Sequence, residues 1–391
     1  MIKKVGLLSL ATATTLMAGG YKIPESSINA VALSDAYVAN ANGADAAYYN
    51  PANMVFSSNK GGAIEVDLTY IGLSAMDYKG TTAVQSVGIV PADTSSKPEN
   101  FLVPTLHYVS PAVDNFRFGL SVVSPAGLSK RWQQSPSSLY ANEFTLQTVE
   151  INPTVAYKVN EILSVAVGAR GVYSKGVVKN AYYNMDGTGF DYGYNLALTL
   201  KPEKDTNLAL TYRSEVDLHV SGNDATHGGV KVALPLPATL SLGISHLFNG
   251  ETTLEAVLEH NYWSAYKNLN FNFSNSAVES SALGQPQSKN WKDTDTLRLG
   301  VTHTYQKITG MVGFSYDPSP TPNSTINYEL PDSDGKIFSL GGRYDISKSV
   351  NIGMAGLISF KNDRAVSNNT LNGEFSNSRA YLLSVGMEYK F

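Results

Sequence analysis

The sequence offers few combinations of residues that could carry out catalysis or bind a metal. It contains no cysteine, and its six histidines are scattered along the chain at positions 107, 219, 227, 246, 260 and 303. We find no Ser/His/carboxylate set, no pair of acids spaced for acid–base chemistry and no cluster with the spacing of metal ligands. We therefore predict no catalytic residue, no metal site and no cofactor, and we expect that the chain is not an enzyme.

The run Ser124-Pro125-Ala126-Gly127 contains two residues that can interrupt a strand. Pro125 has no N–H to donate to a sheet, and Gly127 tolerates the backbone geometry of a bulge. Two interpretations are open: a kink that interrupts a strand, or a strand that ends at Ser124 and leads into a loop. On the residues alone, the loop is the simpler interpretation.

Much of the rest of the chain alternates between hydrophobic and polar residues. Near the C-terminus, Tyr381, Leu383 and Val385 share one face, whereas Ser384 and Glu388 lie on the other. A period of two is typical of a strand with one hydrophobic and one polar side. The same alternation recurs over 208–218, 297–305 and 338–346.

A soluble β-sandwich would also alternate, but two features favour a membrane barrel. Many of the expected strands exceed ten residues, which suits a tilted membrane crossing. Their polar faces carry full charges such as Arg213, Glu215, Arg298 and Arg343, which suits a polar lumen. The fold class is therefore predicted as all-β, an antiparallel transmembrane β-barrel of about fourteen strands. Short turns should alternate with longer external loops, and only the connection near Asn184–Gly187 is shorter than expected.

The N-terminal part of the chain divides into three predicted regions. Met1–Lys4 is basic and 5–18 is apolar but too short to span a bilayer, so 1–18 is predicted to be a signal peptide cleaved after Ala18. Residues 19–60 are rich in alanine and do not alternate, and a lumen of this width needs something to fill it. We predict a hatch over 19–60 inside a barrel over 61–391; a periplasmic tail is the alternative.

Several segments resemble the FadL-type outer-membrane transporters of long-chain fatty acids. Tyr49-Asn50-Pro51-Ala52-Asn53-Met54 looks like the family's Asn-Pro-Ala hatch motif, and the likeness covers the whole mature chain in the family's order. The other segments that carry it are Gly20-Tyr21-Lys22-Ile23-Pro24-Glu25, 103–111, 210–216, 291–293, 317–322 and 330–332.

The resemblance implies passive uptake of hydrophobic molecules, either long-chain fatty acids or aromatic hydrocarbons, by a fourteen-stranded barrel with a hatch. In this family a kink in the third strand opens the wall sideways, at positions that match Pro125, Ala126 and Gly127 here. The expected partners are hydrophobic small molecules, outer-membrane lipid and lipopolysaccharide, without nucleic acid, and the protein is expected to be a monomer.

The resemblance also suggests residues for the ligand pocket. Gly20, Tyr21 and Ile23 are expected at its hatch end, although plain packing is an equal alternative for Tyr21 and Ile23. Glu25, Asn50, Pro51 and Ala52 are assigned to the hatch, where the Asn-Pro-Ala triplet shapes a turn rather than touching ligand.

The family binds the fatty carboxylate with basic residues on its fifth and ninth strands. Lys175, Lys179 and Lys267 lie near these positions, but Asn180 and Asn270 stand opposite the basic residues themselves. This departure leaves the recognition of a carboxylate open, and a lysine at such positions is more often a solvated lumen or rim residue. The shorter external loops near 184–188 and 221–229 suggest weaker capture or a smaller cargo. A general or anion-selective porin is the main alternative, and it would require an open lumen.

Overall fold

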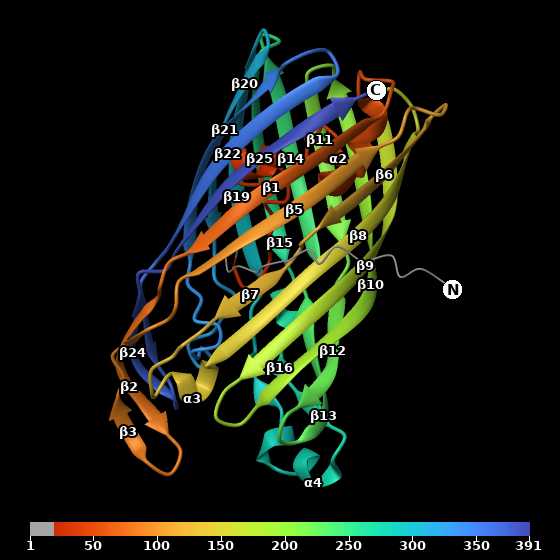
Figure 1. The fold of residues 1–391 in the computed structure, drawn as a ribbon. Coiled ribbons are helices and arrows are strands. Elements are labelled where there is room, and N and C mark those ends of the chain that lie inside the picture. Colours follow the sequence, from red (N-terminus) through yellow and green to blue (C-terminus); the bar gives the residue numbers. More distant parts are fainter. Residues whose placement is uncertain (1–18) are drawn as a thin grey trace.

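The structure is a computed structural model and describes residues 19–391; the expected signal peptide, 1–18, lies outside the described residues. One antiparallel sheet curls into a closed barrel of 14 wall strands (Figure 1). This confirms the predicted fold class. Four wall strands are interrupted, so each is divided into two segments (β6 and β7, β11 and β12, β13 and β14, β15 and β17).

The wall runs in chain order through 18 strand segments. They are β1 (Ala63–Leu73), β5 (Glu99–Val109), β6 (Phe116–Val123), β7 (Gly127–Lys130), β8 (Glu143–Lys158), β9 (Leu163–Lys179), β10 (Asn184–Glu203), β11 (Thr206–Arg213), β12 (Val216–Asp224), β13 (Gly228–Leu236), β14 (Thr239–Phe248), β15 (Thr252–Asn261), β17 (Phe271–Phe273), β19 (Thr294–Tyr305), β20 (Ile308–Asp317), β21 (Gly335–Asp345), β22 (Val350–Lys361) and β25 (Arg379–Lys390).

The barrel closes between its first and last strands. β1 pairs with β25 along its whole length, from Ala63 opposite Lys390 to Leu73 opposite Ala380. A closed sheet has no free edge, which is what a membrane-spanning sheet requires because lipid cannot satisfy backbone N–H and C=O groups.

Alternation sorts the side chains of each wall strand onto two faces. Val66, Leu68 and Tyr70 of β1 are exposed on the outside, whereas Glu65 and Asp67 between them are buried in the lumen. The outer face is therefore apolar and the inner face polar, as in outer-membrane barrels. Among the described residues, no helix is long and apolar enough to cross a membrane.

The two ends of the barrel differ. At the end that carries the C-terminus the connections are short, as at Lys204–Asp205 and Gln306–Lys307, and by the usual asymmetry this end faces the periplasm (Figure 1). At the other end, the long connections fold into structure of their own. The turn expected near Asn184–Gly187 is instead at Asn180–Tyr183, because β10 begins at Asn184 and pairs with β9 from there.

A small extracellular sheet was not expected from the sequence. It consists of β2 (Asp77–Val84), β3 (Gly88–Pro91), β4 (Thr94–Ser95), β23 (Arg364–Ser367) and β24 (Leu371–Ser376). Its buried side packs on an aromatic cluster that includes Trp132, Tyr328 and Phe375. The remaining external elements are α3 (Ser138–Ala141), η2 (Trp263–Ala265), β16 (Asn268–Leu269), α4 (Ser276–Glu279), η3 (Ala282–Gly284) and β18 (Gln287–Ser288).

Residues 19–60 lie inside the barrel and are almost entirely buried (Figure 1). Their elements are α1 (Ile28–Ala32), α2 (Ala46–Tyr49) and η1 (Pro51–Phe56). Polar wall residues on opposite sides of the barrel hold this segment: Glu255 accepts hydrogen bonds from the amides of Val38 and Ala39, and Ser164 donates to the Ala52 carbonyl oxygen. We refer to 19–60 as the hatch.

Candidate functional site

The third wall strand, β6 with β7, is broken at Ser124–Ala126. β8 pairs with Val123 of β6 through Glu150 and with Gly127 of β7 through Gln147, so three residues of the third strand face only two of β8. Pro125 cannot donate a backbone hydrogen bond. Instead of a backbone carbonyl group, the Thr148 hydroxyl oxygen accepts the hydrogen bond of the Ala126 amide at 3.1 Å. We call Ser124–Ala126 the break.

On its other side, the third wall strand is next to β5, and a longer stretch there lacks backbone pairing; we call this stretch the seam. β5 pairs with β6 only from Leu106 to Val109, whereas its pairing with β1 extends from Glu99 to Val109. The extracellular half of β5 therefore has no backbone partner on the side of β7. Beyond the seam, contact resumes through the Ser96–Trp132 bridge and the Arg131–Glu99 ion pair at 2.5 Å.

The start of the hatch covers the break from inside. The Ile23 amide donates to the Pro125 carbonyl oxygen at 2.9 Å, and the Gly127 amide donates to the Tyr21 carbonyl oxygen at 2.8 Å. Lys22 lies opposite Ala126 in this short antiparallel bridge. The hatch thus supplies the hydrogen bonds that the interrupted wall lacks.

Tyr21 is held in a cage of aromatic side chains on the inner side of the break. Its ring centroid lies 4.9 Å from that of Trp263, 5.7 Å from that of Trp291 and 6.2 Å from that of Tyr266. Its hydroxyl donates to the Pro235 carbonyl oxygen at 2.6 Å, and the side chain is fully buried. Edge-to-face pairs of this kind stabilise aromatic clusters beyond simple burial.

An apolar cavity of about 230 Å³ opens at the extracellular end above this cage. We call it the outer vestibule. Phe144, Val178, Leu269 and Phe271 form its apolar wall, and none of the residues that line it is Lys or Arg. The full lining is Tyr140, Phe144, Val178, Asn180, Tyr182, Tyr183, Leu269, Phe271, Gln287, Asn327 and Glu329.

A second, narrow cavity lies between the outer vestibule and the cage, and we call it the throat. It holds only about 10 Å³ and shares Phe144, Asn327 and Glu329 with the vestibule, while Tyr21 lines its inner end. An ion pair between Lys289 and Glu329 lies in its wall. The path from outside therefore stops at Tyr21.

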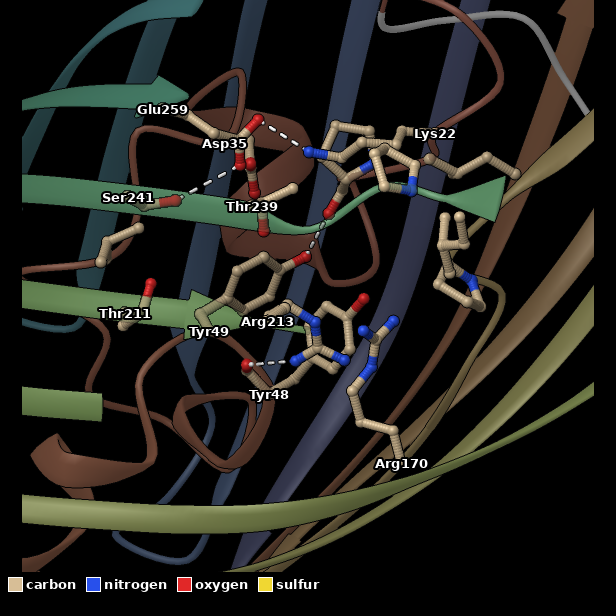
Figure 2. Close-up of a pocket in the computed structure, with 16 residues that line it drawn as sticks. Lys22, Asp35, Tyr48, Tyr49, Arg170, Thr211, Arg213, Thr239, Ser241 and Glu259 are labelled. Carbon is tan, nitrogen blue, oxygen red and sulfur yellow. Dashed lines mark hydrogen bonds and ion pairs between the residues drawn. The ribbon is translucent and has the colours of Figure 1, made fainter. Parts of the chain in front are cut away.

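Below Tyr21 lies a cavity of about 60 Å³ that borders the break at Pro125; Figure 2 shows it, and we call it the inner cavity. Its lining combines apolar residues, such as Ile23 and Leu236, with charged ones. Arg170 contacts Glu150 at 2.9 Å, Arg213 pairs with the same carboxylate, and the Arg213 guanidinium lies 4.2 Å from the ring centroid of Tyr48. Two guanidinium groups against one carboxylate leave an excess positive charge on this wall.

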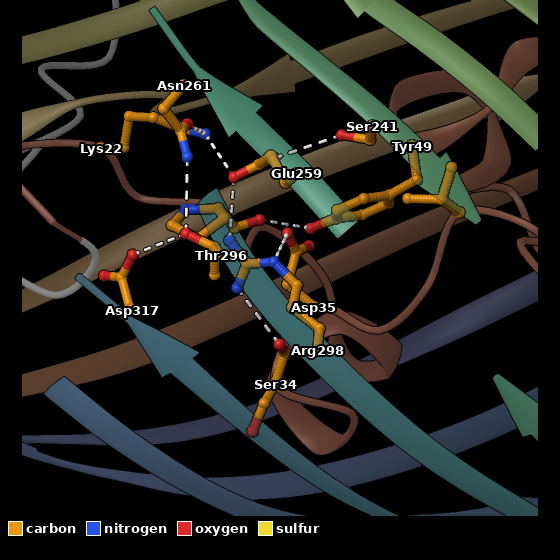
Figure 3. A network of polar contacts seen from close by, with 12 residues as sticks. Lys22, Ser34, Asp35, Tyr49, Ser241, Glu259, Asn261, Thr296, Arg298 and Asp317 are labelled. Atoms are coloured by element: carbon orange, nitrogen blue, oxygen red, sulfur yellow. Dashed lines mark hydrogen bonds and ion pairs between the residues drawn. The ribbon is translucent and has the colours of Figure 1, made fainter. Parts of the chain in front are cut away.

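Charged residues also tie the hatch to the opposite wall (Figure 3). Lys22 Nζ donates to Glu259 Oε1 at 2.8 Å and to Asn261 Oδ1 at 2.6 Å, and Arg298 donates to Glu259 at 3.0 Å. Arg298 Nε lies 3.6 Å from the carboxylate of Asp35. We call Lys22, Glu259, Arg298 and Asp35 the hatch network. Its two cations and two anions balance, as buried charges require.

The Asn50-Pro51-Ala52 triplet packs within the hatch. The Asn50 side chain accepts from the Ala52 amide at 3.2 Å, where Pro51 begins η1, and donates to the Val38 carbonyl oxygen at 2.9 Å. The neighbouring Asn53 donates to the carbonyl oxygens of Ala39 and Ala41. These contacts suit a role in shaping the hatch.

The three lysines predicted for the ligand pocket lie in exposed or half-exposed positions. Lys175 is exposed on the outer face, on the same side of β9 as Tyr173, and Lys267 is exposed in the external connection before β16. Lys179 is paired with Glu143 at 2.9 Å and is half exposed. None of the three lines the outer vestibule, the throat or the inner cavity.

Lys22, Arg170 and Arg213 line the inner cavity, and Lys289 lines the throat. The sequence signal for Arg213 was its place on the polar face of an alternating strand; nothing local distinguished Arg170. Gly20 lies against Trp263, and Ile23 lines the inner cavity. Glu25 is buried in the hatch. Among residues 19–391, no group of three His, Cys, Asp or Glu side chains is arranged to hold a metal.

Comparison with known proteins agrees with this architecture. Residues 9–391 match the family described as outer membrane protein transport protein (OMPP1/FadL/TodX). The long-chain fatty acid transport protein of Escherichia coli K12 is 23% identical over 369 aligned positions, covering 78% of this chain and 81% of the relative.

Solved structures share the fold. A FadL homologue of Pseudomonas aeruginosa superposes with a TM-score of 0.82 at 19% identity, covering 95% of this chain and 100% of the other. The toluene transporter TodX of Pseudomonas putida superposes with a TM-score of 0.68 at 18% identity, covering 97% of this chain and 100% of the other.

Proposed function

Because the chain belongs to the OMPP1/FadL/TodX family of outer membrane transport proteins, we propose that it lets hydrophobic molecules leave sideways through the break in its third wall strand. The protein is a passive outer-membrane transporter of hydrophobic compounds. One observation carries the proposed route: a wall break lies directly behind a lumen that the hatch closes. Cargo that has passed Tyr21 faces this break sooner than any path to the periplasm.

A sideways exit suits the chemistry of the cargo. Each CH₂ group prefers an apolar environment to water by about 0.8 kcal/mol, so release into the bilayer core is favoured over release into the periplasm. The outward face of the wall beside the break is apolar, with Leu102 and Phe118 exposed toward lipid.

A diffusion porin fits less well. The porin alternative requires an open lumen, but the hatch is buried across the barrel, and the cavities at its upper boundary are small. A hydrated ion entering from outside would meet the aromatic cage around Tyr21. We therefore expect little steady ionic conductance.

The outer vestibule favours a small neutral cargo. An engineered cavity of about 150 Å³ binds benzene, so 230 Å³ suits a single substituted ring better than a whole long acyl chain. A fatty carboxylate would also need a cation or several donors, and no Lys or Arg lines this cavity. Toluene-like aromatic hydrocarbons are thus our first candidate cargo, and long-chain fatty acids are the second.

The experiment is uptake by a strain that lacks this protein, complemented with wild type or with Gly127→Arg. Radiolabelled toluene and oleate are supplied separately, and Gly310→Arg serves as a matched control because Gly310 has open space around its Cα. We expect Gly127→Arg to reduce uptake while Gly310→Arg does not. Normal uptake by Gly127→Arg would exclude the sideways exit, and uptake of oleate without toluene would reverse the order of cargoes.

A further inference from the structure

Gly19 and Gly20, the first described residues of the hatch, lie against two buried carboxylates. The backbone nitrogen of Gly19 contacts the carboxylate of Asp317, and that of Gly20 donates to Asp332 Oδ2 at 3.1 Å. Both aspartates are almost completely buried. A pair of acids is thus aimed at the beginning of the hatch.

Among residues 19–391, Lys361 is the only cation that forms an ion pair with either of these two acids. Lys361 contacts Asp332 at 3.0 Å, while Asp317 accepts a hydrogen bond from Thr296 at 2.8 Å (Figure 3). Two carboxylates and one ammonium leave an excess negative charge in a buried place. Such a charge is strongly unfavourable without a further partner.

The neighbouring cations are committed elsewhere. Lys22 and Arg298 are balanced by Glu259 and Asp35 within the hatch network. Arg364 donates to the carbonyl oxygens of Asp332 and Thr321 and to the side chains of Ser319 and Asn323. The nearby Glu25 is itself an acid, so it adds to the excess instead of relieving it.

We propose that proteolytic cleavage between Ala18 and Gly19 creates the missing cation, and that Asp317 and Asp332 bind the new α-ammonium group of Gly19. A signal-peptidase-type endopeptidase adds water across the amide bond, which leaves a carboxylate on Ala18 and a protonated amine on Gly19. An ammonium group has three N–H donors and a full charge, whereas the uncleaved peptide offers one neutral N–H.

The site fits this dipeptide closely. A Cβ on Gly19 would collide with the Pro318 carbonyl oxygen, and one on Gly20 would collide with the Trp263 ring. Gly20 also has a φ of +79°, which side-chain-bearing residues rarely adopt. Glycine at both positions lets the Gly19 nitrogen reach Asp317 and the Gly20 nitrogen reach Asp332.

This proposal links cleavage of the signal peptide to closure of the break by the hatch. Gly19 is two residues from Tyr21, so a bound α-ammonium fixes the segment that fills the aromatic cage and covers the break. An unprocessed chain lacks this anchor and leaves Asp317 without its counter-ion.

The first test is the intact mass of the protein extracted from outer membranes, which must correspond to a chain that begins at Gly19. The second is the reactivity of its α-amine toward a water-soluble N-hydroxysuccinimide ester at pH 7, followed by peptide mass spectrometry. Only the neutral amine reacts, and each unit of raised α-amino pKa lowers the neutral fraction about tenfold. We expect labelling at least tenfold slower in the folded protein than after unfolding in hot detergent, a comparison that needs no variant.

Variants then test which carboxylates bind the α-ammonium group. Asp317→Asn and Asp332→Asn should each speed up labelling, whereas Asp334→Asn should not, because Asp334 instead accepts hydrogen bonds from Ser319 and Tyr316. Heat-modifiable migration on gels verifies that each barrel is folded. A different N-terminal residue, or equal labelling of folded and unfolded wild type, would overturn the proposal.

Discussion

Tyr21 and Gly127 are joined across the break in the third wall strand, where the Gly127 amide donates to the Tyr21 carbonyl oxygen at 2.8 Å. This bond links a residue of the hatch to the first residue of the resumed strand. The same Tyr21 places its ring in the aromatic cage. One residue therefore closes both the path from outside and the opening in the wall, and movement of Tyr21 should open both together.

Tyr21→Ala is predicted to open the path. Removing a large buried aromatic side chain destabilises its site by about 3–5 kcal/mol, and here most of that loss falls on the docking of the hatch start. The population of the open state rises accordingly. We expect faster toluene uptake and greater sensitivity of cells to toluene. Tyr192→Ala, which removes an exposed ring from the outer face, is the control and should behave as wild type. Slower uptake by Tyr21→Ala would mean that the ring guides cargo instead of blocking it.

The hatch network is predicted to be strongly coupled. Lys22→Met leaves the buried Glu259 with one cation fewer, and breaking a buried pair in this way costs about 3–5 kcal/mol. Glu259→Gln alone should be similarly unfavourable because it strands Lys22 and Arg298. Protease accessibility of the hatch in intact barrels reports the loss of docking.

Two comparisons test this coupling. The double variant Lys22→Met/Glu259→Gln should be less impaired than the sum of the single variants, since each change removes the partner that the other leaves unpaired. Lys158→Met breaks an ion pair with Glu161, whose side chain is 88% exposed, and should leave stability nearly unchanged. Additive effects of the two hatch substitutions would contradict the network.

The hatch is predicted to dock more tightly in mild acid. Burial raises the pKa of Glu25 to about 7. The positive charges of Arg298 and Lys22 lower this pKa, and the negative charge of Asp317 raises it further, but burial is the largest effect. Within the part of the chain that the structure describes, neither carboxyl oxygen of Glu25 has a hydrogen-bond partner. Because the folded protein binds this proton more tightly than the unfolded chain, the contribution of Glu25 is most favourable below its ordinary pKa and is lost as pH rises through about 7.

The measurement is proteolysis of the hatch between pH 5 and pH 8. Wild type should become more susceptible over this range, and Glu25→Gln should be resistant throughout because a neutral amide replaces the acid. Docking that is independent of pH in wild type would show that Glu25 does not titrate there.

The barrel could be predicted from the sequence because lipid on one side and a polar lumen on the other impose a strict period of two. Leu68 and Asp67 differ in exposure for that reason alone. The ends of the strands were harder to predict. Asn184–Gly187 contains turn-forming residues, yet it is the first part of β10 and pairs with β9.

The site was predicted less completely, because it depends on contacts between distant segments. Pro125 and Gly127 marked the break, but a proline and a glycine cannot reveal that residues 21–23 pair with it. Asp317 and Asp332 stood out only as part of the family likeness, and their orientation toward Gly19 depends on how the hatch fills the lumen. The three predicted lysines lie outside the cavities because nearness in sequence to an expected position does not decide whether a side chain faces the lumen or the lipid.

A reversible cross-link can decide whether the hatch start must move during transport. Lys22 and Ala126 lie opposite each other in the antiparallel bridge over the break. A backbone hydrogen bond lies on each side of this pair, one from residue 23 to residue 125 and one from residue 127 to residue 21. Opposed residues of this kind have Cα atoms close enough for a disulfide. The chain has no cysteine, so Lys22→Cys/Ala126→Cys gives one defined bond.

Because the cross-link fixes the hatch start over the break, we expect uptake of toluene to stop on oxidation and to return on reduction. Lys22→Cys alone controls for the lost ion pair. Thr69→Cys/Ser384→Cys, at directly opposed positions of β1 and β25, controls for a cross-link within the wall and should leave uptake unchanged. If the oxidised Lys22→Cys/Ala126→Cys protein still transports at the rate of its reduced form, cargo does not leave through the break, since the only segment that could uncover it is then held in place.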